Sequence, residues 1–167
     1  KQTIMATLYT DKSALQLPAA GADTWTRDPG VEASGNILYM EAIYTLTSGT
    51  DETAGDIIRI AKLPANARLI PELCKIVRND PGTAFSFTKI GDEPVVTGAF
   101  TGDDDRYSTT VDIAAAGTSD FAYAAQAAGL LGYTLPADAW IIGTLGTITA
   151  PTAGQVIKFV LAYAAAV

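Results

Sequence analysis

The stretch that decides the fold is ILYMEAIYTLTS, residues 37–48. Its apolar residues recur at every second position, the spacing that places side chains on one face of a β-strand. The residues on that face are Leu38, Met40, Ala42, Tyr44 and Leu46. The opposite face mixes polar and apolar residues, namely Tyr39, Glu41, Ile43, Thr45 and Thr47. The pattern predicts a strand with one face in a hydrophobic core.

Further strand patterns follow at regular spacing, separated by turns rich in Gly, Pro and Asp. The predicted strands span residues 55–63, 67–79, 83–90, 94–100, 106–113, 138–150 and 154–166. Pro71 interrupts the second of these and marks an edge or a bulge, because proline cannot donate to a sheet ladder. The last two strands are expected to form a hairpin around APTAG, residues 150–154.

Together these patterns predict an all-β fold, a jelly-roll-like β-sandwich of about eight strands. One segment stays ambiguous. Residues 119–133 are rich in alanine and begin with Ser119, so they could start a helix. The strand interpretation is preferred there, because every flanking element is a strand.

The first 35 residues differ from the rest, since no period of 2 or 3.6 persists in them. We therefore expect an extended N-terminal arm at 1–35 and a β-sandwich domain at 36–167. The arm is too apolar to be a tail that only contacts solvent, so its large apolar residues are candidates for binding a partner surface. These candidates are Leu8, Tyr9, Leu15, Leu17 and Trp25.

Composition limits the chemistry that the chain can perform. Its 167 residues suit one domain, and its net charge of −7 makes nucleic acid and anionic membranes poor partners. It has no histidine, which excludes histidine-based catalysis and histidine-ligated metals. Its one cysteine, Cys74, stands among apolar neighbours and is interpreted as a small buried hydrophobe. No cofactor, no metal site and no catalytic residue is expected.

The sequence also argues against a membrane or targeting segment. The N-terminal KQTIMATLYTDK has no apolar run of signal-peptide length. Residues 121–157 carry a single charge, Asp138, but glycines and prolines interrupt them and their threonines alternate. We interpret this segment as strands.

Two sets of carboxylates suggest alternative functions for the chain. Asp103, Asp104 and Asp105 lie in a predicted loop, TGDDDR, and supply hard oxygen ligands of the kind calcium prefers, although a solvated loop is the simpler interpretation. Paired carboxylates also serve glycoside hydrolysis, and the strand candidates are Glu41, Glu72 and Asp112. A polar strand face explains them equally well.

The C-terminal third is depleted in charge. Residues 121–167 contain only Asp138 and Lys158. Subunit interfaces are depleted in charge at their centres, so these strands are expected to pack on the core with one face and on another chain with the other. The alternative is that alanine and threonine simply face water.

Three segments resemble one family. TAGDIIRIAKLPANARLIPE at 53–72, NDPGTAFSFTKIGDEP at 79–94 and DDDRYSTTVDIAAAG at 103–117 are similar to the jelly-roll decoration, or cement, proteins of tailed bacteriophage capsids. The resemblance covers about residues 50–117 and the expected C-terminal hairpin, and it does not extend well to the first 35 residues.

This resemblance implies a structural virion protein with no enzyme activity. It would sit on the outer surface of the head, bind the major capsid protein, form a homotrimer and stabilise the junctions between capsomers. Two alternatives remain open: another virion component, such as a tail, head-fibre or receptor-binding module, or a carbohydrate-active or calcium-dependent lectin domain.

Overall fold

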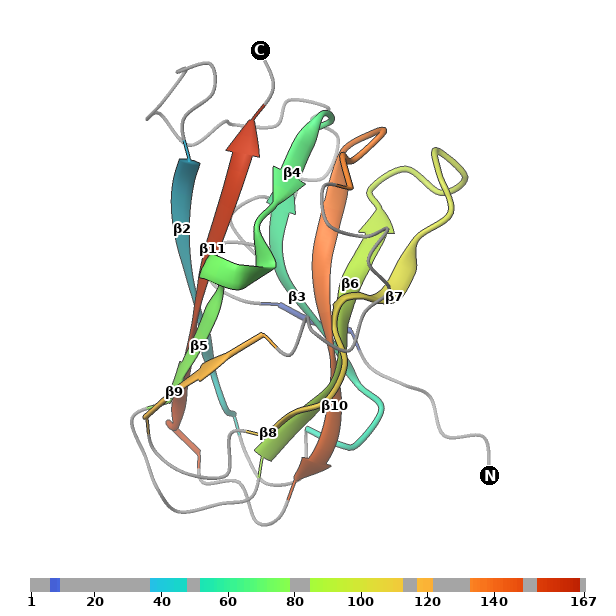
Figure 1. Cartoon of the computed structure of the whole chain (residues 1–167). Helices are drawn as coiled ribbons and strands as arrows, with labels where there is room; N and C mark the ends of the chain where they lie inside the picture. Colours follow the sequence, from blue (N-terminus) through green and yellow to red (C-terminus); the bar gives the residue numbers. More distant parts are fainter. Residues whose placement is uncertain are drawn as a thin grey trace, which may run out of the picture.

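A computed structural model describes residues 7–9, 37–47, 52–78, 85–112, 117–121, 133–148 and 153–165. These residues form two facing β-sheets (Figure 1). The elements are β1 (Thr7–Tyr9), β2 (Ile37–Thr45), β3 (Ile57–Leu63), β4 (Ala67–Leu69), the 3-10 turn η1 (Pro71–Leu73), β5 (Lys75–Arg78), β6 (Phe85–Pro94), β7 (Asp103–Ser108), β8 (Val111–Asp112), β9 (Gly117–Asp120), β10 (Ala139–Ile148) and β11 (Val156–Ala165). No helix within these ranges is long and apolar enough to cross a membrane.

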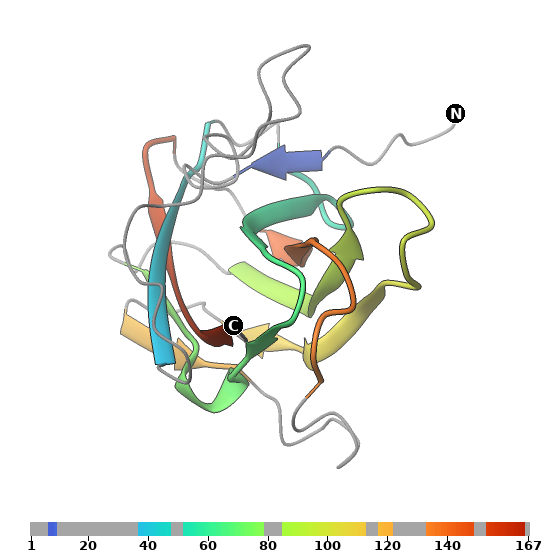
Figure 2. The same ribbon diagram turned by 90° about the horizontal axis from the view of Figure 1, so that it is seen from above.

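The two sheets have different strand orders. Sheet A runs β1-β3-β10-β6-β7, and β8 also pairs with β6. Sheet B runs β2-β11-β5-β9, and β4 also pairs with β11. The described pairs are antiparallel except β1 with β3. Seen from above, β2 and β11 lie on one side of the molecule and β3, β6 and β10 on the other (Figure 2). The predicted fold class, a jelly-roll-like β-sandwich, is confirmed.

The alternating patterns of β2 and β11 produce the core as predicted. In β2, Met40, Ala42 and Tyr44 are buried while their sequence neighbours are exposed. In β11, Ile157, Phe159 and Leu161 are buried in the same way. Each buried aliphatic or aromatic side chain contributes about 1.5–3 kcal/mol relative to an exposed one. The hydrophobic effect therefore specifies which face of each strand turns inward.

An aromatic pair joins the two layers. Phe87 of β6 in sheet A and Phe159 of β11 in sheet B are fully buried, and their ring centroids lie 5.6 Å apart in an edge-to-face arrangement. Gly143 of β10 makes room for this pair, because a Cβ there would lie 2.9 Å from Cδ1 of Phe87. The core is closely packed at this point, so both sheets depend on it.

The predicted hairpin between the last two strands is wrong. β10 lies in sheet A between β3 and β6, whereas β11 lies in sheet B between β2 and β5. The connection crosses from one sheet to the other, and Gly154 donates its N–H to the Leu46 carbonyl at 2.8 Å. Both strands carry apolar inner faces that pack across the sandwich. Strand periodicity reports such burial but not the sheet to which a strand belongs.

The predicted strand at residues 67–79 is divided. Pro71 begins the turn η1, in which Cys74 donates its N–H to the Pro71 carbonyl at 3.1 Å. β4 and β5, on either side of η1, both pair with β11. Pro71 thus lies in a bulge-like turn and not at an edge: residues 70–74 stand opposite only residues 161–162 of β11, and the missing N–H and fixed φ of proline suit the start of a turn.

The predicted strand at 94–100 and loop at 101–106 are exchanged. β6 runs on to Pro94, residues 95–102 connect it to β7, and β7 begins at Asp103. Aspartate disfavours strands intrinsically. Here an ion pair across the strands, Lys89 of β6 with Asp104 of β7 at 2.8 Å, stabilises the acidic run in a ladder.

The N-terminal arm is described only at β1, which pairs in parallel with β3 and places Leu8 opposite Ile58. The remainder of 1–35 lies outside the described residues. The ambiguous segment 119–133 is described only at its ends, where β9 is a strand through Asp120.

Candidate interaction surfaces

The sequence-predicted partner-binding residues fall into two groups. Leu8 and Tyr9 lie in β1, opposite Ile58 and Arg59 of β3 at the edge of sheet A. Leu15, Leu17 and Trp25 lie outside the described residues. Their role as partner contacts stays a prediction.

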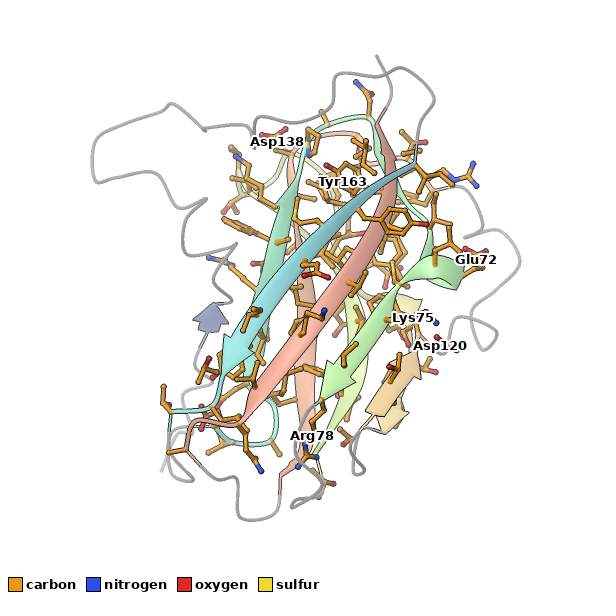
Figure 3. The ribbon with its side chains drawn as sticks, turned by 90° about the vertical axis from the view of Figure 1, so that its left-hand side faces the viewer. Glu72, Lys75, Arg78, Asp120, Asp138 and Tyr163 are labelled. Carbon is orange, nitrogen blue, oxygen red and sulfur yellow. The ribbon has the colours of Figure 1, made fainter. Side chains whose placement is uncertain are left out.

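A different surface is open in the structure, the outer face of sheet B. We define it by the side chains that turn away from the core on β2, β11, β5 and β9: Ile37, Tyr39, Glu41, Ile43, Thr45, Val156, Lys158, Val160, Lys75, Val77, Thr118 and Asp120. Figure 3 faces this sheet. Tyr39 is 63% exposed, Ile37 46% and Ile43 39%. Three large apolar side chains on one strand therefore face solvent.

The sequence carried a signal for this surface. Tyr39 and Ile43 interrupt the polar face of the first strand pattern, where a solvated strand would show polar residues alone. The significance of these two residues was missed, because single exposed apolar residues are common and only the fold assembles them with Val77, Val156 and Val160.

Charged residues on the outer face of sheet B are paired within the chain. Lys158 binds Glu41 at 3.1 Å, joining β11 to β2. Lys75 binds Asp120 at 2.7 Å, joining β5 to β9, and the two side chains lie next to each other in Figure 3. Two lysines thus balance two carboxylates. The face is neutral on a chain whose net charge is −7.

The low-charge C-terminal strands differ in how their outer faces are covered. On β10, Trp140 is only 4% exposed, and the guanidinium of Arg59 lies 5.5 Å from its ring centroid. Arg59 in turn forms an ion pair with Glu93 of β6. Trp140 is therefore buried beneath a salt bridge on the outer side of sheet A. On β11, by contrast, Val156 and Val160 keep part of their surface exposed.

An acidic corner lies where β6 and β7 pair. Ligand oxygens of Asp103, Asp104 and Asp105 all lie within 4.8 Å of one another. Lys89 neutralises one of them, at 2.8 Å from Asp104. A hydrogen bond to Asp103 and the charges of its neighbours raise the pKa of Asp105. Carboxylates at such distances repel one another, and the nearby cations offset that repulsion.

A buried ion pair adjoins this corner. Arg106 of β7 donates from Nε to Oδ2 of Asp92 in β6 at 2.7 Å, and the Asp92 side chain is fully buried. The Arg106 guanidinium also stacks 3.6 Å from the ring centroid of Tyr133. Burial raises the pKa of Asp92, while the Tyr107 hydroxyl and Arg106 act in the opposite direction. The cluster ties β6, β7 and the segment before β10 together.

The carboxylates considered for glycoside hydrolysis are placed on separate elements. Glu41 lies on β2, where it pairs with Lys158. Glu72 lies in the turn η1, and Asp112 lies in β8, opposite Ser86 in sheet A. Glu41 and Asp112 belong to different sheets. The three carboxylates thus lie on three separate elements of the described part of the chain.

Cys74 is buried as predicted. Its Sγ accepts the N–H of Ala162 at 3.3 Å and donates to the Ile70 carbonyl at 3.2 Å. Burial raises the pKa of the thiol to about 12, so the thiolate is scarce at neutral pH. A protonated, enclosed thiol is unsuited to nucleophilic or metal chemistry.

Comparison with known proteins supplies a fold relative. No family model and no curated protein matches the sequence. Among solved structures, the chain is similar to a chain of the "Capsid of Ralstonia phage GP4", with a TM-score of 0.65 and 17% sequence identity. The alignment covers 97% of this chain and 99% of that chain. The two chains therefore share one fold over nearly their whole, closely similar lengths.

Proposed function

We propose that this chain is a structural protein of a tailed-phage virion that attaches to the outside of the head and stabilises the junctions between capsomers. The observation that carries the proposal is the end-to-end likeness of its fold to a chain of a phage capsid. Because both chains are covered almost completely, the likeness concerns the whole subunit and not a shared module.

The sequence supports a role in adhesion. The segments at 53–72, 79–94 and 103–117 resemble capsid decoration proteins. The chain has no histidine, and its one cysteine is enclosed and protonated. The proposed role is therefore non-enzymatic and needs no cofactor. The resemblance implies that the partner is the major capsid protein, and the acidic charge of the chain disfavours nucleic acid.

The mechanism would be mechanical. A subunit that contacts two neighbouring capsomers adds contact energy that must be broken before the seam between them can open. Many copies on one closed shell act together, so each contact can be modest. A homotrimer is implied by the resemblance alone, and the outer face of sheet B favours a different symmetry, argued below.

Co-sedimentation with undecorated shells tests this proposal. Purified protein is expected to bind until a fixed number of copies per shell is reached, and labelled antibody is expected to mark the head surface of intact particles. Absence of saturable binding would contradict the proposal. Label confined to tails or fibres would instead assign the chain to another virion component.

A further inference from the structure

The outer face of sheet B has a regular arrangement across its strands. β11 runs through the middle, with β2 on one side and β5 on the other. Val160 of β11 stands between Glu41 of β2 and Lys75 of β5. The two residues that flank Val160 are thus opposite in charge.

The next row along the strands is apolar on both flanks. Lys158 of β11 stands between Ile43 of β2 and Val77 of β5. Lys158 itself extends toward β2, where its Nζ lies 3.1 Å from Oε1 of Glu41. Its charge is therefore drawn away from the midline of the face.

A third row, at Ala162, differs from these two. Ala162 of β11 stands opposite Tyr39 of β2 on one flank. On the other flank its carbonyl accepts the N–H of Ile70 at 2.8 Å, directly before η1. The turn η1 carries Leu73, whose side chain is 37% exposed. Tyr39 on β2 is 63% exposed. Because Ala162 itself is fully buried, this row adds no open surface on the midline of the face.

A two-fold axis parallel to β11, just above the face, would exchange these flanks between two molecules. Glu41 would then lie over the partner's Lys75, and Ile43 over the partner's Val77. Symmetric dimer contacts must be self-complementary in this way, because one patch serves both subunits. The rows of Val160 and Lys158 meet that requirement: acid opposes base in the first, and apolar opposes apolar in the second.

We propose that the outer face of sheet B binds a second copy of this chain about a two-fold axis along β11. The neutrality of this face explains how two molecules, each with a net charge of −7, can approach there without strong repulsion. The contact stands on this geometry alone. Its use in joining two capsomers, one copy on each, rests on the proposed function.

The face is small, so the contact between free copies is expected to be modest. Nine residues of β2 extend over about 30 Å, and four strands span about 15 Å. That is about 450 Å² on each molecule, or about 900 Å² for the pair, which is below the usual size of a stable specific interface. Dimerisation should therefore depend on protein concentration, and the local concentration on a shell would favour it.

Charge reversal tests the pairing across the axis. Sedimentation equilibrium over a concentration series should give a dimer for the native chain. Glu41→Lys and Lys75→Glu should each weaken dimerisation at least tenfold, because like charges then face each other. The double variant should restore part of it, because opposite charges again face each other across the axis while the in-chain pairs with Lys158 and Asp120 stay broken. Asp104→Lys and Lys89→Glu are matched controls, since they break an exposed cross-strand pair in sheet A and should leave dimerisation unchanged.

Cross-linking provides a second readout that does not depend on affinity. Val160→Cys on the axis should be joined to its counterpart by a bismaleimide spanning about 10 Å, the usual spacing of packed sheets. Cys74 is buried and should not react. Thr147→Cys on β10 is the control, because it is exposed on sheet A and should give no cross-link.

A monomer at every concentration without a Val160→Cys cross-link, free or on shells, overturns the two-fold contact. A trimer, or a dimer that the double variant fails to restore even in part, overturns it as well. If the chain binds shells but never dimerises, the two-fold contact is wrong and the proposed function is supported. If the chain dimerises but does not bind shells, the proposed function is wrong and the two-fold contact is supported.

Discussion

At the scale of single residues, the Asp92–Arg106 pair is the most demanding feature. A fully buried carboxylate is tolerated because a guanidinium hydrogen-bonds it at 2.7 Å and an aromatic ring covers that guanidinium. Removing one partner of such a pair leaves an uncompensated charge in the interior. The ion pair is thus required for β6 and β7 to pack together at this point.

Arg106→Ala should destabilise the fold by about 3 kcal/mol, the lower end for breaking a buried pair, because Arg106 is not wholly enclosed. Urea denaturation followed by tryptophan fluorescence measures the effect. Lys89→Ala is the control, since it removes an exposed, solvent-screened pair and should cost far less stability. Equal losses in the two variants would contradict the interpretation of Asp92 as buried and dependent on Arg106.

The pH dependence of stability reports on the same residue. The pKa of folded Asp92 lies above the ordinary value of 3.8, so the folded state binds this proton more tightly than the unfolded state. Its contribution to stability is complete below 3.8 and is lost as pH rises through the folded pKa. Native protein should therefore gain stability relative to Asp92→Asn on acidification. Melting temperatures of both are measured from pH 7 to pH 3: the value for the native chain minus the value for Asp92→Asn should rise toward acid pH, and a fall would refute the interpretation.

At the scale of the elements, strand faces were predictable and strand partners were not. The period of two in β2 and β11 correctly gave the buried residues, because one-sided burial leaves its mark on every second position. The hairpin of β10 with β11 was wrong, because both strands have apolar inner faces and periodicity does not distinguish pairing in one sheet from packing across two sheets.

The prediction of a loop at the acidic run, which is part of strand β7, was wrong for a different physical reason. Three consecutive aspartates resemble a turn in isolation, and β6–β7 pairing brings Lys89 of β6 within 2.8 Å of Asp104, which makes them compatible with a ladder. Long-range ion pairs leave no local pattern in the sequence. The same holds for the outer face of sheet B, whose residues come from four separate segments.

Gly143→Ala should destabilise the sandwich by about 1–3 kcal/mol, because the added methyl group meets a fully buried Phe87 ring that has no room to retreat. Thermal unfolding measures the loss. Thr147→Ala on the same strand is exposed and should change stability by less than about 0.5 kcal/mol. Similar melting temperatures for Gly143→Ala and the native chain would show that the core is less tightly packed at this position.

At the scale of the whole molecule, the chain combines a well-packed sandwich with surfaces suited to adhesion. Its interior depends on two facing sheets, whereas the outer face of sheet B is neutral and partly apolar. Folding and attachment therefore rest on different residues, and variants should separate them.

Deletion of residues 1–20 tests this separation. It removes β1, which adds only three residues to the edge of sheet A, so the sandwich should still unfold in one cooperative transition. Shell binding should weaken, because the deletion also removes Leu15 and Leu17 from the predicted arm. Circular dichroism and co-sedimentation measure the two effects. An unfolded product would mean that the arm is part of the folding unit.

The most direct measurement is the temperature at which undecorated phage heads are disrupted, recorded as purified protein is added. A structural protein that bridges capsomers is predicted to raise this temperature progressively, to a plateau reached when its sites on the shell are filled. A disruption temperature that stays constant at saturating protein would contradict the account.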